Sequence, residues 1–271
     1  MIGHDQQSAG AGAPDKRSEA RLQLHSMLQW LARLANSYVD ADPAGRHLTL
    51  LWDGDRHAFA TRAFHGGLTV ELRLPSLEMQ FLENGVLSPH VLDVEGRSPA
   101  EVEAWVLVEL LHRGVDRSRF SKQLPYGSAK LMHGDARQFS PDSHEVELAE
   151  LATWLDTAAG VLEQLASRLR AAGQSVDGEI RCWPEQLHLA IAVALEPGSA
   201  SEALRVGLSA GDDKTAEPHF LVIAERTRSA STMLPNSVLP ASRIAASGMS
   251  SDDIVAFLEQ MIDASRRKLA H

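Results

Sequence analysis

Four side chains in the last third of the chain have the chemistry of metal ligands. They are His188, Asp212, Glu217 and His219. Imidazole and carboxylate groups suit zinc, manganese or iron. These groups would converge if the extended runs that begin near residues 187 and 219 form neighbouring strands and the turn between them folds back. Such an arrangement would support a metal-dependent enzyme of the hydrolase kind.

The spacing of these residues does not by itself create a metal site. The sequence has no His-x-Glu, His-Glu-x-x-His or paired-cysteine motif that would fix the ligand geometry. His188 stands between two leucines, so it points to the opposite face of its strand. On that face Ala190, Ala192 and Ala194 form a groove of small residues, against which a helix could pack. We therefore predict no cofactor and keep a divalent metal at the four residues as the alternative.

Two proline-containing pairs and one cysteine offer further candidates. Trp183–Pro184 and Glu217–Pro218 are rigid and extended, because proline biases the residue before it away from helix. They either set where strands begin or line a pocket, with Trp183 as an apolar wall and Glu217 as a polar anchor. Cys182 is the only cysteine, and we interpret it as a small buried hydrophobic residue. The candidate ligand-binding residues are Trp183, Glu185, His188, Asp212, Glu217 and His219.

Three blocks of the same region resemble the signature of a family of uncharacterised bacterial proteins. The blocks are RCWPEQLHLA (181–190), VGLSAGDD (206–213) and AEPHF (216–220). The family reads Trp-Pro-His-His-Phe-Asp, Ser-Pro-Gly-Asp and Glu-Pro-Tyr at these places. LPYGSAKLMHGDARQF (124–139) and ELATWLDTAAGVLEQL (150–165) are also similar to it, so the resemblance covers about residues 95–270.

The chain departs from this signature where chemistry would be expected. Glu185, Gln186, Leu187 and His188 stand in place of His-His-Phe-Asp, Ala210 in place of proline and His219 in place of tyrosine. The resemblance therefore implies a divergent member without the paired histidines, and it supplies a location without a reaction. We expect a non-catalytic or degenerate protein that binds a small molecule or a protein partner, with a homo-oligomer as one expected form.

The composition argues against several other classes of protein. The net charge is -10, from 36 acidic and 26 basic residues. No Lys/Arg-rich run is long enough to follow a phosphate backbone, so we expect no nucleic-acid partner. The chain has neither a signal-peptide core nor a run of about 18 apolar residues that could span a membrane. We therefore expect a cytoplasmic protein.

Local patterns predict an α+β fold that positions these candidates. Helices are expected from about residue 19 to 39, 98 to 113, 143 to 172 and 250 to 269, from apolar residues at helical spacing. Ser98 with Glu101 and Ser250 with Asp253 are typical of capping boxes. Strands are expected at 47–52, 57–64, 68–74 and 77–82, and again at 179–183, 187–195, 203–209 and 219–225. Their connections are too short for helices, which predicts an antiparallel meander.

The order helix, four strands, capped helix thus occurs twice. We expect a disordered tail (1–18), an N-terminal half (19–114), an irregular connection (115–142) and a C-terminal half (143–271). SPAEVEAW (98–105) and SSDDIVAF (250–257) share their register, as an internal duplication or any two capped amphipathic helices would. If the halves are related, their strands could join into one mainly antiparallel sheet with helices packed on one face.

Overall fold

The computed structural model describes residues 15–127, 131–195, 202–226 and 229–269. The N-terminal half contains α1 (Lys16–Tyr38), η1 (Arg46–Leu48), β1 (Leu50–Asp53), β2 (Ala58–Ala60), β3 (Leu68–Arg73), β4 (Met79–Glu83), β5 (Val86–Leu92) and α2 (Pro99–His112). The connection contains η2 (Arg117–Arg119) and η3 (Pro141–His144). The C-terminal half contains α3 (Glu145–Ala171), β6 (Val176–Trp183), β7 (His188–Ala194), β8 (Glu202–Ser209), β9 (His219–Arg226), β10 (Ser229–Pro240), α4 (Ala241–Ser247) and α5 (Ser251–Leu269).

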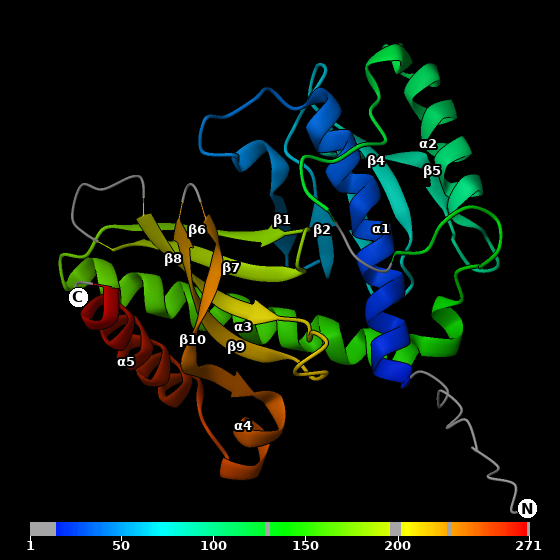
Figure 1. Ribbon diagram of the computed structural model, residues 1–271. Coiled ribbons are helices and arrows are strands. Elements are labelled where there is room, and N and C mark those ends of the chain that lie inside the picture. The colour runs from blue at the N-terminus through cyan, green and yellow to red at the C-terminus, as the bar shows by residue number, and fades with distance from the viewer. Residues whose placement is uncertain (1–14, 128–130, 196–201, 227–228, 270–271) are drawn as a thin grey trace, which may run out of the picture.

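All ten strands belong to one sheet, which confirms the α+β class. The strand order is β10-β9-β8-β7-β6-β1-β2-β3-β4-β5, and every neighbouring pair is antiparallel. The first strands of the two halves, β1 and β6, meet in the middle, where Leu50 pairs with Cys182 and Leu51 with Arg181. The two groups of five strands therefore extend outward from a shared centre (Figure 1).

Each half has five strands rather than the four expected from the sequence. The additional strands, β5 and β10, are the two edges of the sheet. Pro89 lies in β5 and Pro235 in β10, and proline within an extended run weakens a strand prediction. An edge strand tolerates proline because one side of its backbone needs no partner in the sheet. The strand prediction therefore failed at the two edges of the sheet, which are the places where a strand can contain proline.

Both halves share a further detail of backbone geometry. The turn that follows β1 ends at His57 and the turn that follows β6 ends at Leu187. Both residues have a left-handed backbone, with φ of 47° and 54°, although neither is a glycine. The repeated element order and this shared turn are what an internal duplication would produce, and the duplication itself stays a prediction.

The helices form by the local signals that the sequence carries. Ser98 and Glu101 form a capping box at α2, in which the Ser98 Oγ accepts from the Glu101 N–H and the Glu101 carboxylate accepts from the Ser98 N–H. Ser250 and Asp253 make the same reciprocal bonds at α5. Both predicted boxes are confirmed. The first helix begins at Lys16, earlier than expected, so residues 16–18 are helical, whereas residues 1–14 of the predicted tail lie outside the described residues.

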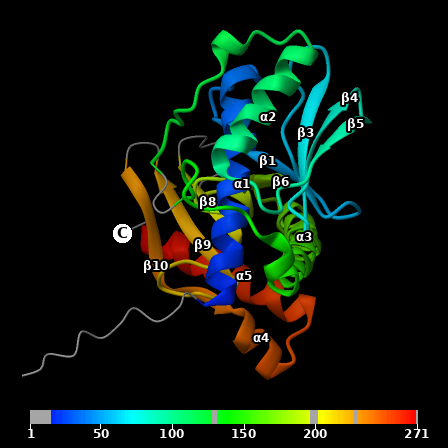
Figure 2. The same ribbon diagram turned by 90° about the vertical axis from the view of Figure 1, so that its right-hand side faces the viewer.

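The core of the C-terminal half lies between its strands and two helices. Leu189, Ile191 and Val193 of β7 are fully buried in the hydrophobic core. α3 contacts β6, β7 and β8, while α5 contacts α3 and β9, so both helices lie on the same side of these strands (Figure 2). Because side chains alternate along a strand, the even-numbered residues of β7 face the opposite side. That opposite side carries the candidate site.

The first helix, α1, occupies the middle of the molecule. Buried residues lie all around it and include the polar Gln23, Ser26 and Gln29. It contacts β3 of its own half and α3 of the other half, and Figure 1 shows it crossing between the two halves. A helix buried on all sides serves both halves as core.

Candidate functional site

A groove lies on the side of β6, β7 and β8 that faces away from α3. Its floor consists of Ala192 and Ala194 from β7 and Ala203 from β8, and Trp183 and Arg181 of β6 line its side. The volume is about 530 Å³. We call this cavity the alanine groove. Its size falls within the range of small-molecule pockets, roughly 300–1,000 Å³.

The alanine groove exists because its floor residues end at Cβ. Ala192 pairs with Asp177 of β6 and Arg205 of β8, and Ala194 pairs with Ala203. Of the three alanines that the sequence analysis assigned to a groove of small residues, Ala192 and Ala194 line the cavity, whereas Ala190 is buried outside its lining. In the structure Ala192 and Ala194 line a cavity, whereas the sequence analysis considered a helix packed against them.

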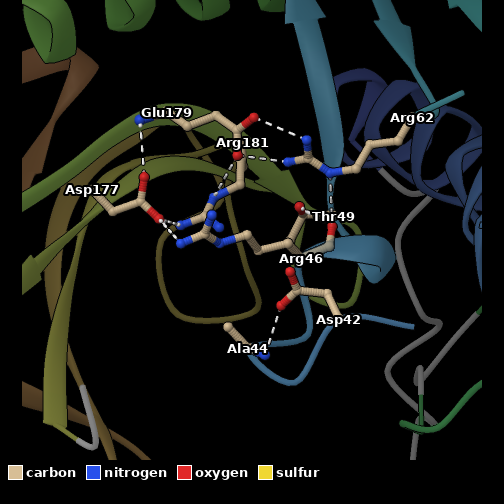
Figure 3. A network of polar contacts seen from close by, with 8 residues as sticks. All are labelled: Asp42, Ala44, Arg46, Thr49, Arg62, Asp177, Glu179 and Arg181. Carbon is tan, nitrogen blue, oxygen red and sulfur yellow. Dashed lines mark hydrogen bonds and ion pairs between the residues drawn. The ribbon is translucent and has the colours of Figure 1, made fainter. Parts of the chain in front are cut away.

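An ion network between the two halves closes one side of the alanine groove. Arg62 of the N-terminal half forms two hydrogen bonds to the Glu179 carboxylate, at 2.9 and 2.6 Å, and its Nε donates to the Arg46 carbonyl at 3.1 Å. The Asp177 carboxylate forms ion pairs with Arg46 and Arg181, with Nη2–Oδ2 distances of 3.3 and 2.9 Å. Figure 3 shows the guanidinium groups of Arg46, Arg62 and Arg181 close to the carboxylates of Asp177 and Glu179, with Asp42 in the loop below Arg46.

The arginines of this wall differ in their access to solvent. The Arg181 side chain is 6% exposed, whereas that of Arg46 is 47% exposed. The loop that carries Arg46 is shaped by Asp42, whose carboxylate accepts from the Ala44 N–H at 2.7 Å, and by Thr49, whose hydroxyl donates to the Arg46 carbonyl. Arg46 is therefore the cation of the groove that a dissolved ligand can reach.

Trp183 is a half-buried wall of the alanine groove. The guanidinium carbons of Arg205 and Arg181 lie 4.5 and 5.1 Å from its ring centroid. Arg205 also donates to the Gln186 side chain at 3.1 Å. Stacked arginines fix the orientation of the indole, since each cation is attracted to the electron-rich ring face. Of the predicted site residues, Trp183 and Glu185 line the groove.

His188 and His219 lie beside the groove as buried groups. His188 pairs with Ser209 of β8, which pairs with His219 of β9, so the imidazoles project from the same side of the sheet. Both histidines are buried, and His188 Nδ1 and His219 Nε2 have no hydrogen-bond partner among the described residues. Burial, together with the electrostatic effects of Arg205, His219 and His25, lowers the pKa of His188 to about 3. His188 is therefore neutral at physiological pH.

The helix α1 covers the part of this sheet face that carries His188 and His219. His25 Nε2 lies 2.8 Å from the carbonyl oxygen of Pro184, and Gln29 donates to the same oxygen at 2.7 Å. Burial also lowers the pKa of His25, against the opposing effect of its backbone contacts. The helix thus covers the histidine end of the face, which leaves the alanine end open as the groove.

The other predicted ligands have local structural partners. The Asp212 carboxylate accepts from the N–H groups of Lys214 and Thr215, both at 2.7 Å, and so shapes its own turn. The Glu217 carboxylate accepts from the N–H and hydroxyl of Ser242, both at 2.7 Å, near the start of α4. Glu217 therefore does not line the alanine groove as a polar anchor.

The structure does not bring His188, Asp212, Glu217 and His219 together as one metal site. Within the described part of the chain, a single group of three or more His, Cys, Asp or Glu side chains has ligand atoms all within 4.8 Å of one another. That group is His90, Glu109 and His112. The four predicted residues do not converge because hydrogen bonds hold the Asp212 carboxylate in its own turn and the Glu217 carboxylate at the start of α4.

Cys182 and Tyr126 complete the surroundings of the groove. Cys182 is buried on the core side, and burial raises the pKa of its thiol, so the nucleophilic thiolate is disfavoured. This agrees with its interpretation as a small hydrophobic residue. Tyr126 lines the groove from the connection, and its hydroxyl donates to Gln29 at 3.1 Å. Burial raises the pKa of Tyr126, so its hydroxyl stays protonated.

Sequence reasoning missed several residues of the site. Arg46, Tyr126 and Asp177 come from three separate segments, and none belongs to a recognisable motif. The one available signal is that Tyr126 lies in the block 124–139, which contributes to the family resemblance. Their meeting depends on the β1–β6 pairing, which joins the two halves.

Comparisons with known proteins add no further constraint on the site. None of the protein families, curated proteins or solved structures compared with this chain is similar to it. In the described part of the chain, no helix combines the length and the apolar character that crossing a membrane requires. The geometry of the groove and its side chains must therefore carry the functional argument.

Proposed function

We propose that the protein binds a small organic molecule in the alanine groove, and that this molecule has a flat apolar body and an anionic group. The observation that carries the proposal is a floor of three alanines beside Trp183, with the half-exposed Arg46 at the same cavity. Small-molecule sites commonly combine an apolar, aromatic lining with a few placed polar groups.

The apolar part of the ligand is assigned from the floor and the indole. Ala192, Ala194 and Ala203 present methyl groups over which a planar group could lie without steric hindrance. Trp183 is held by Arg181 and Arg205, so its wall is oriented before a ligand arrives. Preorganisation of this kind lowers the entropic cost of binding.

The anionic part of the ligand is assigned from Arg46. Its guanidinium lines the cavity, its side chain is 47% exposed, and Figure 3 shows its contacts. Arginine matches carboxylate or phosphate with two parallel hydrogen bonds. Arg46 would make this contact because its ion pair with Asp177, at 3.3 Å, is the longer of the two that Asp177 makes.

The proposal is one of binding without catalysis. Asp177 and Glu179 are held in ion pairs by arginines. His188 is buried and neutral next to the groove. The proposal therefore gives these three groups structural roles.

Saturation-transfer NMR with a set of aromatic carboxylates and the matching neutral amides tests the proposal. Carboxylates are expected to bind the wild-type protein more tightly than their amides. Ala192→Phe, which fills the floor, should weaken binding by at least about tenfold, a loss of about 1.4 kcal/mol. Arg46→Gln should remove the preference for carboxylates while leaving the amides unaffected.

The matched control is Ala171→Phe, because Ala171 is an exposed alanine near the end of α3. This variant adds the same side chain outside the groove and should bind as the wild type does. Equal binding of a carboxylate by the Ala192→Phe and Ala171→Phe variants would place the ligand elsewhere. No detectable binding of any probe to the wild-type protein would contradict the proposed class of ligand.

Self-association is a second candidate, supported by a different surface. β5 is an edge strand and exposes Val86, Leu87 and Val91, and the neighbouring α2 exposes Val108 and Leu111. Exposed apolar groups on a strand edge can pair with another chain. Light scattering coupled to size-exclusion chromatography tests this candidate, and a monomer at high concentration would contradict it.

A further inference from the structure

A cluster of three potential metal ligands lies at the outer edge of the N-terminal half, remote in strand order from the alanine groove. His90 comes from the edge strand β5, while Glu109 and His112 come from α2. The two helical residues are three positions apart, a spacing that places them on the same face of the helix. The structure adds the third residue, which the sequence places 19 positions upstream of Glu109.

We propose that His90, Glu109 and His112 bind one Zn²⁺ ion, with water as the fourth ligand. This inference goes beyond the proposed function, because it concerns a different part of the sheet. The Glu109 Oε1 lies 3.1 Å from His90 Nδ1 and 3.6 Å from His112 Nδ1. Zinc with three protein ligands and one water is a common open site.

The distances fit a tetrahedral ion. Zinc bonds to nitrogen and oxygen are about 2.0–2.1 Å long, so neighbouring ligand atoms in a tetrahedron are about 3.4 Å apart. The two observed separations lie on either side of this value, and all three ligand atoms lie within 4.8 Å of one another. The spacing of the three ligand atoms is therefore compatible with one tetrahedral ion.

Glu109 is already oriented for this role. Its side chain is only 4% exposed, and its Oε2 accepts from Arg113 at 2.6 Å, which leaves Oε1 directed at the histidines. Arg113 is in turn held by Glu83 at 3.2 Å and lies 4.5 Å from the ring centroid of Phe81. Hydrogen-bonded partners that fix a ligating carboxylate in this way raise metal affinity.

The two imidazoles give the site access to solvent. Each histidine side chain is 54% exposed, and the rings lie edge to face with centroids 6.0 Å apart. A hydrated ion can therefore reach the cluster without any movement of the backbone.

The experiment uses the full chain, stripped of metal, titrated with ZnCl₂ in competition with a colorimetric chelator. We expect one equivalent of zinc per chain. His90→Asn and His112→Asn should each weaken binding by about 100-fold or more, because each removes one of three protein ligands.

His133→Asn is the matched control, because His133 is an exposed histidine outside the cluster; it should bind zinc as the wild type does. Zinc that binds equally well to the His90 and His112 variants would overturn the proposal, as would the absence of competition with the chelator. Half an equivalent of zinc per chain, together with a doubled mass in light scattering, would place the ion between two copies of the chain. That result would overturn the proposal of a site within one chain. The His90 and His112 variants leave the alanine groove unchanged. A negative result for zinc binding would therefore not bear on ligand binding in the groove.

Discussion

Arg62 and Glu179 face each other across the junction of the two halves and form a paired hydrogen-bonded ion bridge, with nitrogen–oxygen distances of 2.9 and 2.6 Å. Arg62 follows β2 of the N-terminal half, and Glu179 lies in β6 of the C-terminal half. The same guanidinium donates to the Arg46 carbonyl. This pair therefore links the junction of the halves to the loop that forms the wall of the alanine groove.

The Arg62–Glu179 pair should show measurable coupling in a double-mutant cycle. The side chains are 25% and 36% exposed, so solvent screening limits the expected coupling energy to about 0.5–1 kcal/mol. The cycle uses Arg62→Gln, Glu179→Gln and the double variant in urea denaturation. The Arg17–Glu150 pair, whose side chains are 52% and 39% exposed, is the control and should show coupling near zero. Equal coupling in the two cycles would argue against a structural role for the junction pair.

Stability should fall as the pH is lowered, because His188 must stay neutral in the folded protein. Burial lowers the pKa of His188 to about 3, whereas the unfolded chain titrates near 6.5. Between these values the unfolded state binds the additional proton, so the free energy of unfolding decreases as pH falls through this window. From pH 7 to pH 5 the expected loss from this group is about 2 kcal/mol.

The test of this pH dependence is urea denaturation of the wild type and of His188→Gln at both pH values. The variant should lose less stability on acidification, although His25, whose pKa is also lowered, still contributes. His133→Gln changes an exposed histidine and should behave as the wild type. The same loss in wild type and His188→Gln would show that His188 is not the source.

Trp183→Ala should cost less stability than the truncation of a core aromatic residue. Trp183 is half-buried at the alanine groove, so we expect a loss of about 1–2 kcal/mol, below the roughly 3–5 kcal/mol of a fully buried ring. Phe220→Ala is the comparison, because Phe220 is fully buried in β9. Urea denaturation midpoints measure both. A loss for Trp183→Ala as large as that for Phe220→Ala would assign the indole to the core and weaken the case for a ligand wall.

The two capping boxes should differ in their contribution to stability. Ser98 is buried, and its hydroxyl also donates to Asp135 at 2.9 Å, whereas Ser250 is exposed. Ser98→Ala should therefore cost about 1–2 kcal/mol and Ser250→Ala about 0.5–1 kcal/mol. Thermal denaturation of the two single variants makes the comparison. A larger loss for Ser250→Ala would show that the partly buried Ser98–Asp135 hydrogen bond adds nothing to the cap.

The sequence by itself determined most of the local elements, although it did not predict the short helix α4 (Ala241–Ser247). The apolar spacing of the helices and the capping boxes at Ser98 and Ser250 depend on contacts within a few residues, so they can be predicted without knowledge of the fold. The short connections then required antiparallel neighbours. The interior strands were found on these grounds, whereas the edge strands β5 and β10 were missed because their prolines contradict the local pattern.

Only the tertiary structure decided which of these elements meet. Arg46 reaches Asp177 because β1 pairs with β6, and His90 reaches Glu109 because α2 lies beside the edge strand. Conversely, His188, Asp212 and Glu217 are close in sequence, yet the two carboxylates are held by local hydrogen bonds in a turn and at a helix start. Local periodicity reports how one segment folds, whereas a site depends on long-range packing whose free energy is spread over the whole core, so no short stretch of sequence contains it.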